Sequence, residues 1–135
     1  MIVYVLDSSA MVAYLRSEQG ADLVREALAD LTNRCFAHAI NLCEVYYGGY
    51  RERGEAAAQE MLQDLYTAGV RLRDDFDSSF WQDAGRLKAD HRRVSLADCC
   101  CVALARRVDG ELLTSDHHAF DRIAPLNLCR LRFIR

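Results

Sequence analysis

Proline, lysine and tryptophan are almost absent from this chain of 135 residues, which has one of each. No proline-rich linker, repeat or low-complexity tract divides it, so we expect a single domain spanning residues 1–135. No apolar run approaches the roughly 18 residues that span a bilayer, which argues against a membrane partner. The first residues also lack the basic segment and cleavage site of a signal peptide. We therefore expect a cytoplasmic protein.

Several motifs of known chemistry are missing as well. The sequence has no C-x-x-C pair, no GxxxxGK[ST] phosphate loop and no Ser-His-Asp signature. Its six cysteines include three consecutive ones at 99–101 inside an apolar run, an arrangement that favours free thiols in a core over disulfides. The net charge of −3 argues against a strongly basic nucleic-acid binder but leaves local patches open. Nearly all the positive charge is arginine, which suits phosphate contacts.

What the sequence has is alternation of strand and helix patterns in a chain that is 51% hydrophobic. We expect strands at 2–6, 34–38, 70–72, 111–115 and 128–134. We expect helices at 8–16, 19–31, 41–53 (with Asn41 as its cap), 55–68, 77–90, 96–108 and 117–122. The alternation predicts an α/β fold with a parallel sheet covered by helices on both faces. In such sheets, ligands bind at the carboxyl ends of the strands, where the strand order reverses.

Four acids fall where that edge is expected. Asp7 and Asp116 each follow a predicted strand, and Glu44 and Asp98 lie in the first turns of helices. Each has a structural explanation, because acids cap helix N-termini and interact favourably with the helix dipole. The spacings Asn41 to Glu44 and Ser95 to Asp98 also match capping boxes.

Capping alone does not require the four acids to converge, yet the predicted topology brings them to one edge. Two carboxylates about 4 Å apart repel by roughly 4 kcal/mol at an effective dielectric constant near 20. A cluster of four must therefore bind protons or cations, and Mg²⁺ or Mn²⁺ suits oxygen ligands. Such a site suits phosphodiester hydrolysis, in which metal ions activate water and stabilise the leaving oxygen.

Four segments of the sequence resemble the signature blocks of PIN-domain nucleases, and most closely those of VapC-type toxins. They are, in the order of that family, "VYVLDSSAMVAYL", "NLCEVYYGG", "SLADCCCVALA" and "LLTSDHHAFDRI". The resemblance covers essentially the whole chain. It implies a three-layer α/β/α sandwich around a central parallel sheet of order 3-2-1-4-5.

The same resemblance implies a Mg²⁺- or Mn²⁺-dependent endoribonuclease, the toxin of a type II toxin–antitoxin pair. A homodimer and an antitoxin protein as partner are implied with it. The residues that match the metal-binding acids of the family are Asp7, Glu44, Asp98 and Asp116. Many relatives have a further acid two or three residues beyond the position of Asp116, where this chain has His117, His118, Ala119 and Phe120.

Other residues near these acids are candidates for supporting roles. Ser9 and Thr114 could orient carboxylates or water through their hydroxyl groups, although capping and strand packing also explain them. Arg92 and Arg93, in a basic stretch before Ser95, and Arg51 could hold RNA phosphates, although a solvated helix end explains them too.

Two alternative functions stay open on the sequence alone. The missing extra acid is consistent with a non-catalytic module that keeps the PIN fold and binds a partner. An aspartate at the end of the first strand is also found in phosphatases and phosphoacceptor domains. However, the second aspartate of haloacid-dehalogenase-like enzymes is here Ser9, and Lys88 fits a receiver domain poorly.

Overall fold

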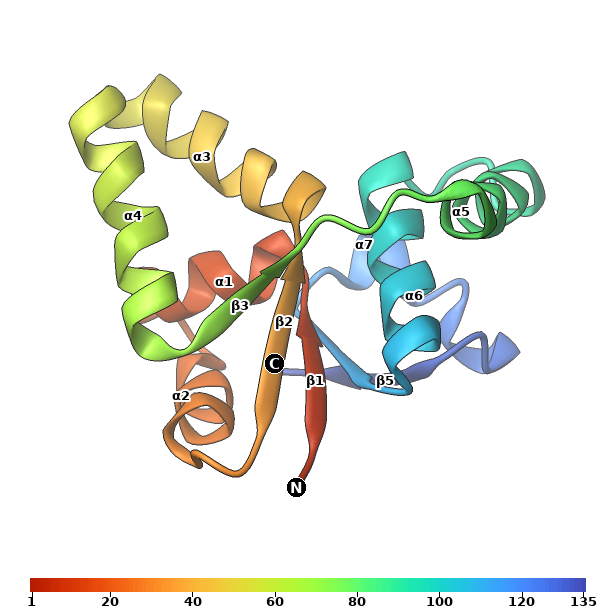
Figure 1. Ribbon diagram of the computed structural model, residues 1–135, viewed down its shortest axis with the longest axis horizontal. Coiled ribbons are helices and arrows are strands. Elements are labelled where there is room, and N and C mark those ends of the chain that lie inside the picture. The colour runs from red at the N-terminus through yellow and green to blue at the C-terminus, as the bar shows by residue number, and fades with distance from the viewer.

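A computed structural model describes all residues 1–135 and is organised around a five-stranded sheet (Figure 1). The strands are β1 (Val3–Leu6), β2 (Arg34–His38), β3 (Val70–Arg73), β4 (Glu111–Thr114) and β5 (Arg130–Phe133). All neighbouring strands are parallel, in the order β3-β2-β1-β4-β5. This confirms the predicted sheet.

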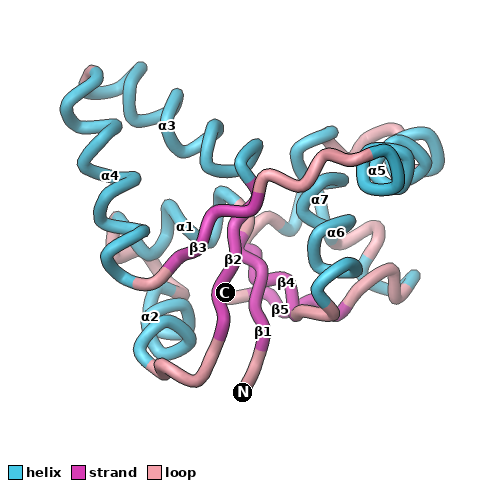
Figure 2. The backbone as a smooth tube through the Cα atoms, in the orientation of Figure 1, coloured by secondary structure: helices cyan, strands magenta, loops and turns pink.

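Helices cover both faces of the sheet (Figures 1 and 2). They are α1 (Ser8–Leu15), α2 (Ala21–Ala29), α3 (Ala39–Arg53), α4 (Glu55–Ala68), α5 (Ser78–Asp90), α6 (Leu96–Val108) and α7 (His117–Phe120), with a short 3₁₀ helix at Ala124–Leu126. Helices α1 to α4 lie on one side and α5 to α7 on the other, which makes the three-layer α/β/α fold. No helix is long and apolar enough to cross a membrane.

Successive residues of the strands enter two separate hydrophobic cores. In β1, Tyr4 and Leu6 pack in the core beneath α1 and α2, whereas Val5 packs in the core beneath α5 and α6. In β4, likewise, Leu113 packs in the first of these cores and Leu112 in the second. Because side chains alternate across a strand, a strand that is buried on both faces is apolar at every position, as the first strand is.

All six cysteines are free thiols, as the sequence indicates. Cys99, Cys100 and Cys101 are buried in α6, and burial raises the pKa of Cys99 to about 11. Burial raises the pKa of Cys101 well above its ordinary value. Cys43, in contrast, is exposed on α3. The run at 99–101 therefore serves as small core side chains rather than as a redox centre.

The predicted start of α3 is wrong. The helix begins at Ala39, and His38 rather than Asn41 is its N-cap, because its Nδ1 atom accepts a hydrogen bond from the Ile40 amide at 3.1 Å. Its Nε2 atom then carries the proton and donates to the backbone carbonyl of Asp75 at 2.8 Å. The predicted helix 19–31 and strand 128–134 are also shorter in the structure, at Ala21–Ala29 and Arg130–Phe133.

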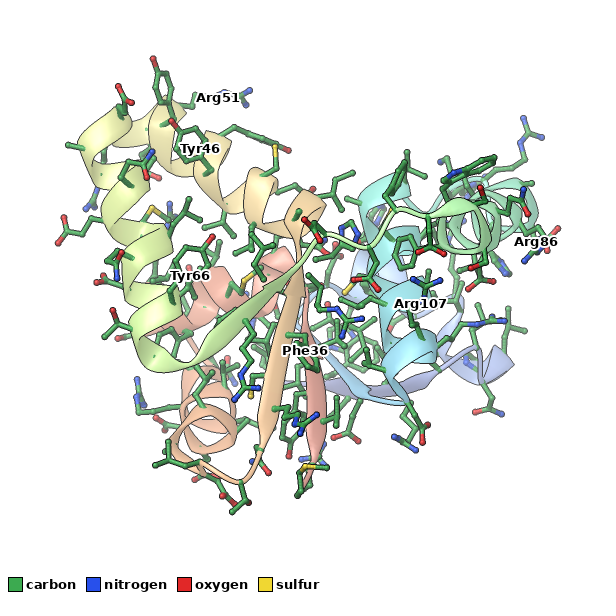
Figure 3. All side chains as sticks on the ribbon, viewed as in Figure 1. Phe36, Tyr46, Arg51, Tyr66, Arg86 and Arg107 are labelled. Carbon is green, nitrogen blue, oxygen red and sulfur yellow. The ribbon has the colours of Figure 1, made fainter.

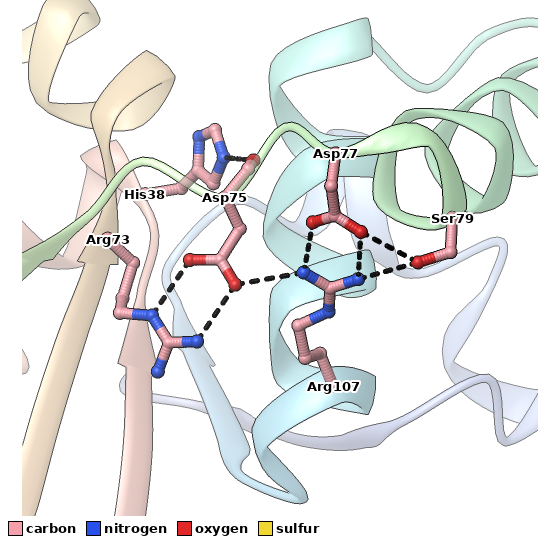
Figure 4. Close-up of polar contacts among 6 residues, drawn as sticks. All are labelled: His38, Arg73, Asp75, Asp77, Ser79 and Arg107. Atoms are coloured by element: carbon pink, nitrogen blue, oxygen red, sulfur yellow. Dashed lines mark hydrogen bonds and ion pairs between the residues drawn. The ribbon is translucent and has the colours of Figure 1, made fainter.

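An arginine–aspartate network holds the loop between β3 and α5 against α6 (Figure 4). Arg73 donates to both carboxylate oxygens of Asp75 at 2.8 Å, and Arg107 of α6 donates to Asp75 at 3.1 Å. Arg107 also donates to Asp77 and to Ser79. The hydrogen bond from Arg73 is the main reason that the pKa of Asp75 falls to about 2. The network fixes the carbonyl that receives the His38 hydrogen bond, and so the start of α3.

Gly20, before α2, occupies a position that other residues cannot adopt without strain. Its φ angle is +96°, in the left-handed region. A Cβ atom at this position would lie 2.7 Å from the backbone oxygen of Ile134, near the end of the chain. The glycine therefore allows the C-terminal segment to pack closely against the turn that precedes α2.

Candidate metal centre

Asp7 directly follows β1 and is 1% exposed. It caps α1, because its Oδ1 atom accepts hydrogen bonds from the Ala10 amide at 2.8 Å and the Ser9 hydroxyl at 2.7 Å. Its Oδ2 atom accepts from the hydroxyl of Thr114, at the end of β4. The predicted contacts of both hydroxyls with a carboxylate are thus present, and they hold both oxygens of Asp7 in fixed directions.

Asp116 lies beside Asp7 because β1 and β4 are neighbours. The Asp7 amide donates to the Leu113 carbonyl at 3.2 Å, and the Asp116 amide donates to the Thr114 hydroxyl at 3.0 Å. The Oδ1 atom of Asp116 accepts from the Ala119 amide at 3.0 Å and so caps α7. Both acids follow strands at the point where the strand order reverses, which is the usual place for ligands in such sheets.

Glu44 and Asp98 are carried by two helices, α3 and α6, that are joined by one buried side chain. The Asn41 Nδ2 atom donates to Glu44 Oε1 at 3.3 Å and to the Ala97 carbonyl at 3.4 Å. Asp98 lies in the first turn of α6, where its amide donates to the Ser95 hydroxyl at 3.1 Å. The predicted cap at Ser95 is confirmed.

Sequence analysis missed Asn41 as a residue of the site, because its spacing from Glu44 also fits a helix cap. The same spacing is the signal that could have found it: residues three apart on a helix are neighbours on its surface, so the Asn41 side chain can contact Glu44. Its burial between two helices is a tertiary feature that no local pattern indicates. Its Oδ1 atom is buried and has no hydrogen-bond partner.

Asp98 interacts electrostatically with each of the other three acids, and we refer to Asp7, Glu44, Asp98 and Asp116 as the carboxylate cluster. Burial raises the pKa of Asp7 to about 6, and repulsion by Asp98 adds to this effect. Burial also raises the pKa of Asp98 to about 6, with added repulsion from Glu44 and Asp116. Such an arrangement favours binding of protons or cations.

The carboxylate cluster fits a hard divalent cation by its chemistry. None of its acids forms an ion pair with an arginine, lysine or histidine. As the side chains stand, however, no three His, Cys, Asp or Glu residues lie close enough to hold one ion together. Mg²⁺ keeps several waters and takes few carboxylates directly, so these unneutralised carboxylates suit such an ion better than one that needs a closed cage of protein ligands.

His117, which directly follows Asp116, does not take the place of the extra acid of the family pattern. His117 bonds through Nδ1 to Asp121 Oδ1 and through Nε2 to the Arg135 carbonyl, both at 2.8 Å. Its ring also stacks on Phe133, with the ring centres 3.9 Å apart. Both nitrogens of His117 are therefore engaged at the C-terminal segment, and Asp121 is engaged with them.

The arginines predicted to contact RNA are all exposed but do not lie together. Arg92 and Arg93 belong to the loop before α6, where Lys88 donates to the backbone carbonyls of Arg92 and Val94. Arg51 lies toward the far end of α3 (Figure 3), with its guanidinium carbon 5.4 Å from the centre of the Tyr47 ring. It is two helical turns, about 10 Å, beyond Glu44 along the helix axis.

The largest cleft in the molecule is not at the carboxylate cluster. It has a volume of about 480 Å³ and lies between α1, α3 and α4, with Leu15, Gly49 and Met61 among its lining residues. Its remaining lining is mostly charged, with Arg16 and Glu52 forming an ion pair across its rim. We assign the chemistry to the cluster rather than to this cleft, because the unpaired acids of the cleft, Glu60 and Asp64, are exposed, whereas burial raises the pKa of Asp7 and Asp98.

Fold and site together define an α/β/α protein with an acidic centre at the reversal point of a parallel sheet. The family model described as PIN domain matches residues 4–126, and this chain belongs to the PIN domain family.

Several solved structures of similar fold are chains of toxin–antitoxin complexes. A chain of DNA-bound VapBC from Salmonella typhimurium is 16% identical with full coverage of both chains and a TM-score of 0.76. A chain of VapBC2 from Rickettsia felis is 18% identical over 98% of each chain, with a TM-score of 0.74. VapC20 of Mycobacterium tuberculosis, described as a toxin that cleaves the sarcin–ricin loop, is 16% identical over 84% of this chain and 89% of its own, with a TM-score of 0.67. No curated protein sequence matches this chain.

Proposed function

We propose that this protein is a Mg²⁺- or Mn²⁺-dependent endoribonuclease that hydrolyses phosphodiester bonds in RNA. One observation carries the proposal: Asp98 repels each of the other three acids of the carboxylate cluster, and none of the four has a cationic partner to offset that repulsion in this PIN-family fold. Membership of the PIN family and the fold shared with a toxin that cleaves the sarcin–ricin loop support the choice of an RNA phosphodiester as substrate.

In this proposal, Asp7, Glu44, Asp98 and Asp116 hold the metal, which when bound polarises the phosphoryl oxygen and lowers the pKa of water. Hydrogen bonds within the chain hold the carboxylates of the site in place. Two hydroxyls and the Ala10 amide fix the carboxylate of Asp7, and supporting hydrogen bonds of this kind orient metal ligands. Water attacks phosphorus in line with the leaving ribose oxygen, and no covalent enzyme intermediate forms.

The supporting residues belong to the same proposal. Ser9 and Thr114 act as orienting hydroxyls, and Asn41 holds Glu44 through its amide. Arg92, Arg93 and Arg51 contact phosphates of the RNA strand, because guanidinium groups match phosphate geometry.

We also propose that the chain is one domain over residues 1–135 and the toxin of a toxin–antitoxin pair, with an antitoxin protein as partner. The similarity in fold to chains of VapBC complexes supports this partner. A homodimer is part of the proposal, and light scattering of the purified protein tests it. A toxin that acts on cellular RNA works in the cytoplasm.

The test of the activity is cleavage of single-stranded RNA in the presence of Mg²⁺ or Mn²⁺. We expect Asp7→Asn and Asp98→Asn to reduce the rate by more than the roughly 10–100-fold that the loss of a supporting hydrogen bond causes. Asp64→Asn, at an exposed position without an ion pair, is the matched control and should cleave like the wild type. Cleavage that needs no metal and survives both cluster substitutions would contradict the proposal.

A non-catalytic binding module is the second candidate. Two observations favour it. No three of the acids lie close enough to hold one ion, and residues 117–120 include no acid. Calorimetric titration with Mn²⁺ separates the two functions. Binding that Asp98→Asn abolishes supports the enzyme, and the absence of measurable binding supports the module. The phosphatase alternative is disfavoured, because the position of the second aspartate of haloacid-dehalogenase-like enzymes is occupied by Ser9, whose hydroxyl donates to Asp7.

A further inference from the structure

A small basic cleft lies where the loop before α6 meets α7, and one of its lining residues, Ala119, donates a hydrogen bond to Asp116 of the carboxylate cluster. Its volume is about 270 Å³, and its lining residues are Arg93, Val94, His118, Ala119 and Arg122. Val94 and Ala119 are buried, whereas the two arginines and His118 are exposed. The cleft thus has an apolar base and a basic rim, with no acid among its lining residues.

The two arginines of this cleft have no ionic partners. Other arginines of the chain, such as Arg73, Arg106 and Arg107, form ion pairs, but neither Arg93 nor Arg122 does. Two guanidinium groups on one cleft without a carboxylate repel each other, and an anion bound between them relieves that repulsion. A planar guanidinium presents several donors in a fork that matches phosphate oxygens.

The two walls of the cleft are the segments that position two acids of the cluster. On one side, the Ala119 amide donates to Asp116. On the other, Arg93 lies two residues before Ser95, whose hydroxyl accepts from the Asp98 amide. Lys88 strengthens this wall through its hydrogen bonds to the loop carbonyls. An anion in the cleft therefore lies at a fixed position relative to the cluster.

We propose that Arg93, His118 and Arg122 form a subsite for a phosphodiester group of the RNA strand that neighbours the bond to be cut. This inference rests on the proposed nuclease function. A strand that carries one negative charge per nucleotide is repelled by the carboxylate cluster, and cations adjacent to the cluster offset that repulsion. The subsite sets the position of the strand and contributes nothing to the chemical step.

The first test is binding of a 5′-fluorescein-labelled 12-nucleotide RNA, measured by fluorescence anisotropy in metal-free buffer so that no cleavage occurs. We expect Arg93→Gln and Arg122→Gln each to raise the Kd roughly tenfold, as loss of a hydrogen bond to a charged group does. The dependence of log K on log salt should become shallower by about 0.7 for each phosphate that the variant no longer neutralises. Arg34→Gln is the matched control, because Arg34 is also exposed and unpaired but lies at the opposite, amino-terminal end of β2.

The second test locates the phosphate. A single neutral methylphosphonate linkage is moved along the RNA, and we expect the affinity of the wild type to fall about tenfold at one position only. The double variant R93Q/R122Q should bind that oligonucleotide and the unmodified one equally. Melting curves of all variants confirm that the exposed substitutions leave the fold intact.

Different outcomes refute different proposals. Equal affinity of wild type and both variants, or equal weakening by Arg34→Gln, overturns the subsite while RNA cleavage still supports the nuclease. A wild-type protein that neither binds nor cuts RNA overturns the nuclease and the subsite together. Loss of affinity confined to the two cleft variants, with a single sensitive linkage, supports the subsite.

Discussion

Replacing Asp7 with asparagine should stabilise the metal-free protein at pH 8, although it removes a residue of the carboxylate cluster. The pKa of Asp7 rises from an ordinary value of 3.8 to about 6 in the folded chain, mainly because of burial. The folded protein therefore keeps this proton at pH values where the unfolded chain has lost it. The resulting contribution to stability is complete below pH 3.8, decreases as the pH rises, and is lost above about pH 6.

The size of the effect follows from the difference between the pKa of Asp7 in the folded chain and its ordinary value. This difference corresponds to a cost of about 3 kcal/mol for ionising Asp7 in the folded state, which Asn avoids. Asparagine also has one acceptor oxygen fewer, and the poorer contact with Thr114 costs about 1 kcal/mol. We expect a net gain of about 2 kcal/mol at pH 8, or a rise in Tm of roughly 5–8 °C, and no gain near pH 4.5, where the two effects cancel.

The assay is thermal unfolding followed by circular dichroism in EDTA at pH 4.5 and pH 8. Asp64→Asn, at an exposed site, is the control and should leave Tm unchanged at both values. Added Mn²⁺ should raise the Tm of the wild type at pH 8 more than that of Asp7→Asn, because ligands that bind the folded state stabilise it. An Asp7→Asn protein that melts no higher than the wild type at pH 8 would refute the reasoning about buried charge.

Three further substitutions test individual features. Gly20→Ala should lower the free energy of unfolding by roughly 1–3 kcal/mol in urea titrations, because of its positive φ and the nearby Ile134 oxygen; an unchanged midpoint contradicts this. Ser9→Ala should raise the pKa of Asp7 further, as carboxyl NMR titration would show, since a hydrogen bond that stabilises the ionised form is removed; a lower pKa counts against it. Asp75 has a pKa of about 2 in the folded chain, so its ionised form stabilises the fold above about pH 4, and this stabilisation disappears as the pH falls through 2. Asp75→Asn should therefore lose less stability than the wild type between pH 4 and pH 2.

Much of the architecture could be predicted because local sequence patterns indicate it. A continuously apolar strand such as β1 indicates burial on both faces, and the alternation of strands with helices indicates a parallel sheet. The acids follow strands or open helices, so topology alone brings them to one edge. The order of the strands, in contrast, came from resemblance to the PIN family, because periodicity does not determine which strands are neighbours.

The features that could not be predicted depend on distant partners. His38 caps α3 through a ring nitrogen, an unusual capping group that sequence rules do not include, and its own partner is the carbonyl of Asp75, 37 residues away. The bond between Asn41 and the Ala97 carbonyl spans 56 residues. The basic cleft likewise combines Arg93 with Arg122, and nothing in either local segment indicates that they meet.

The burial of the thiols in α6 has a practical consequence for spectroscopy. Of the six cysteines, only Cys43 is exposed, and burial raises the pKa of each of the other five. A maleimide dye should therefore attach to the native wild-type chain at one place, immediately before Glu44 in the sequence. The protein thus carries its own attachment point for a fluorescent reporter of events at the acidic edge, without any cysteine having to be removed.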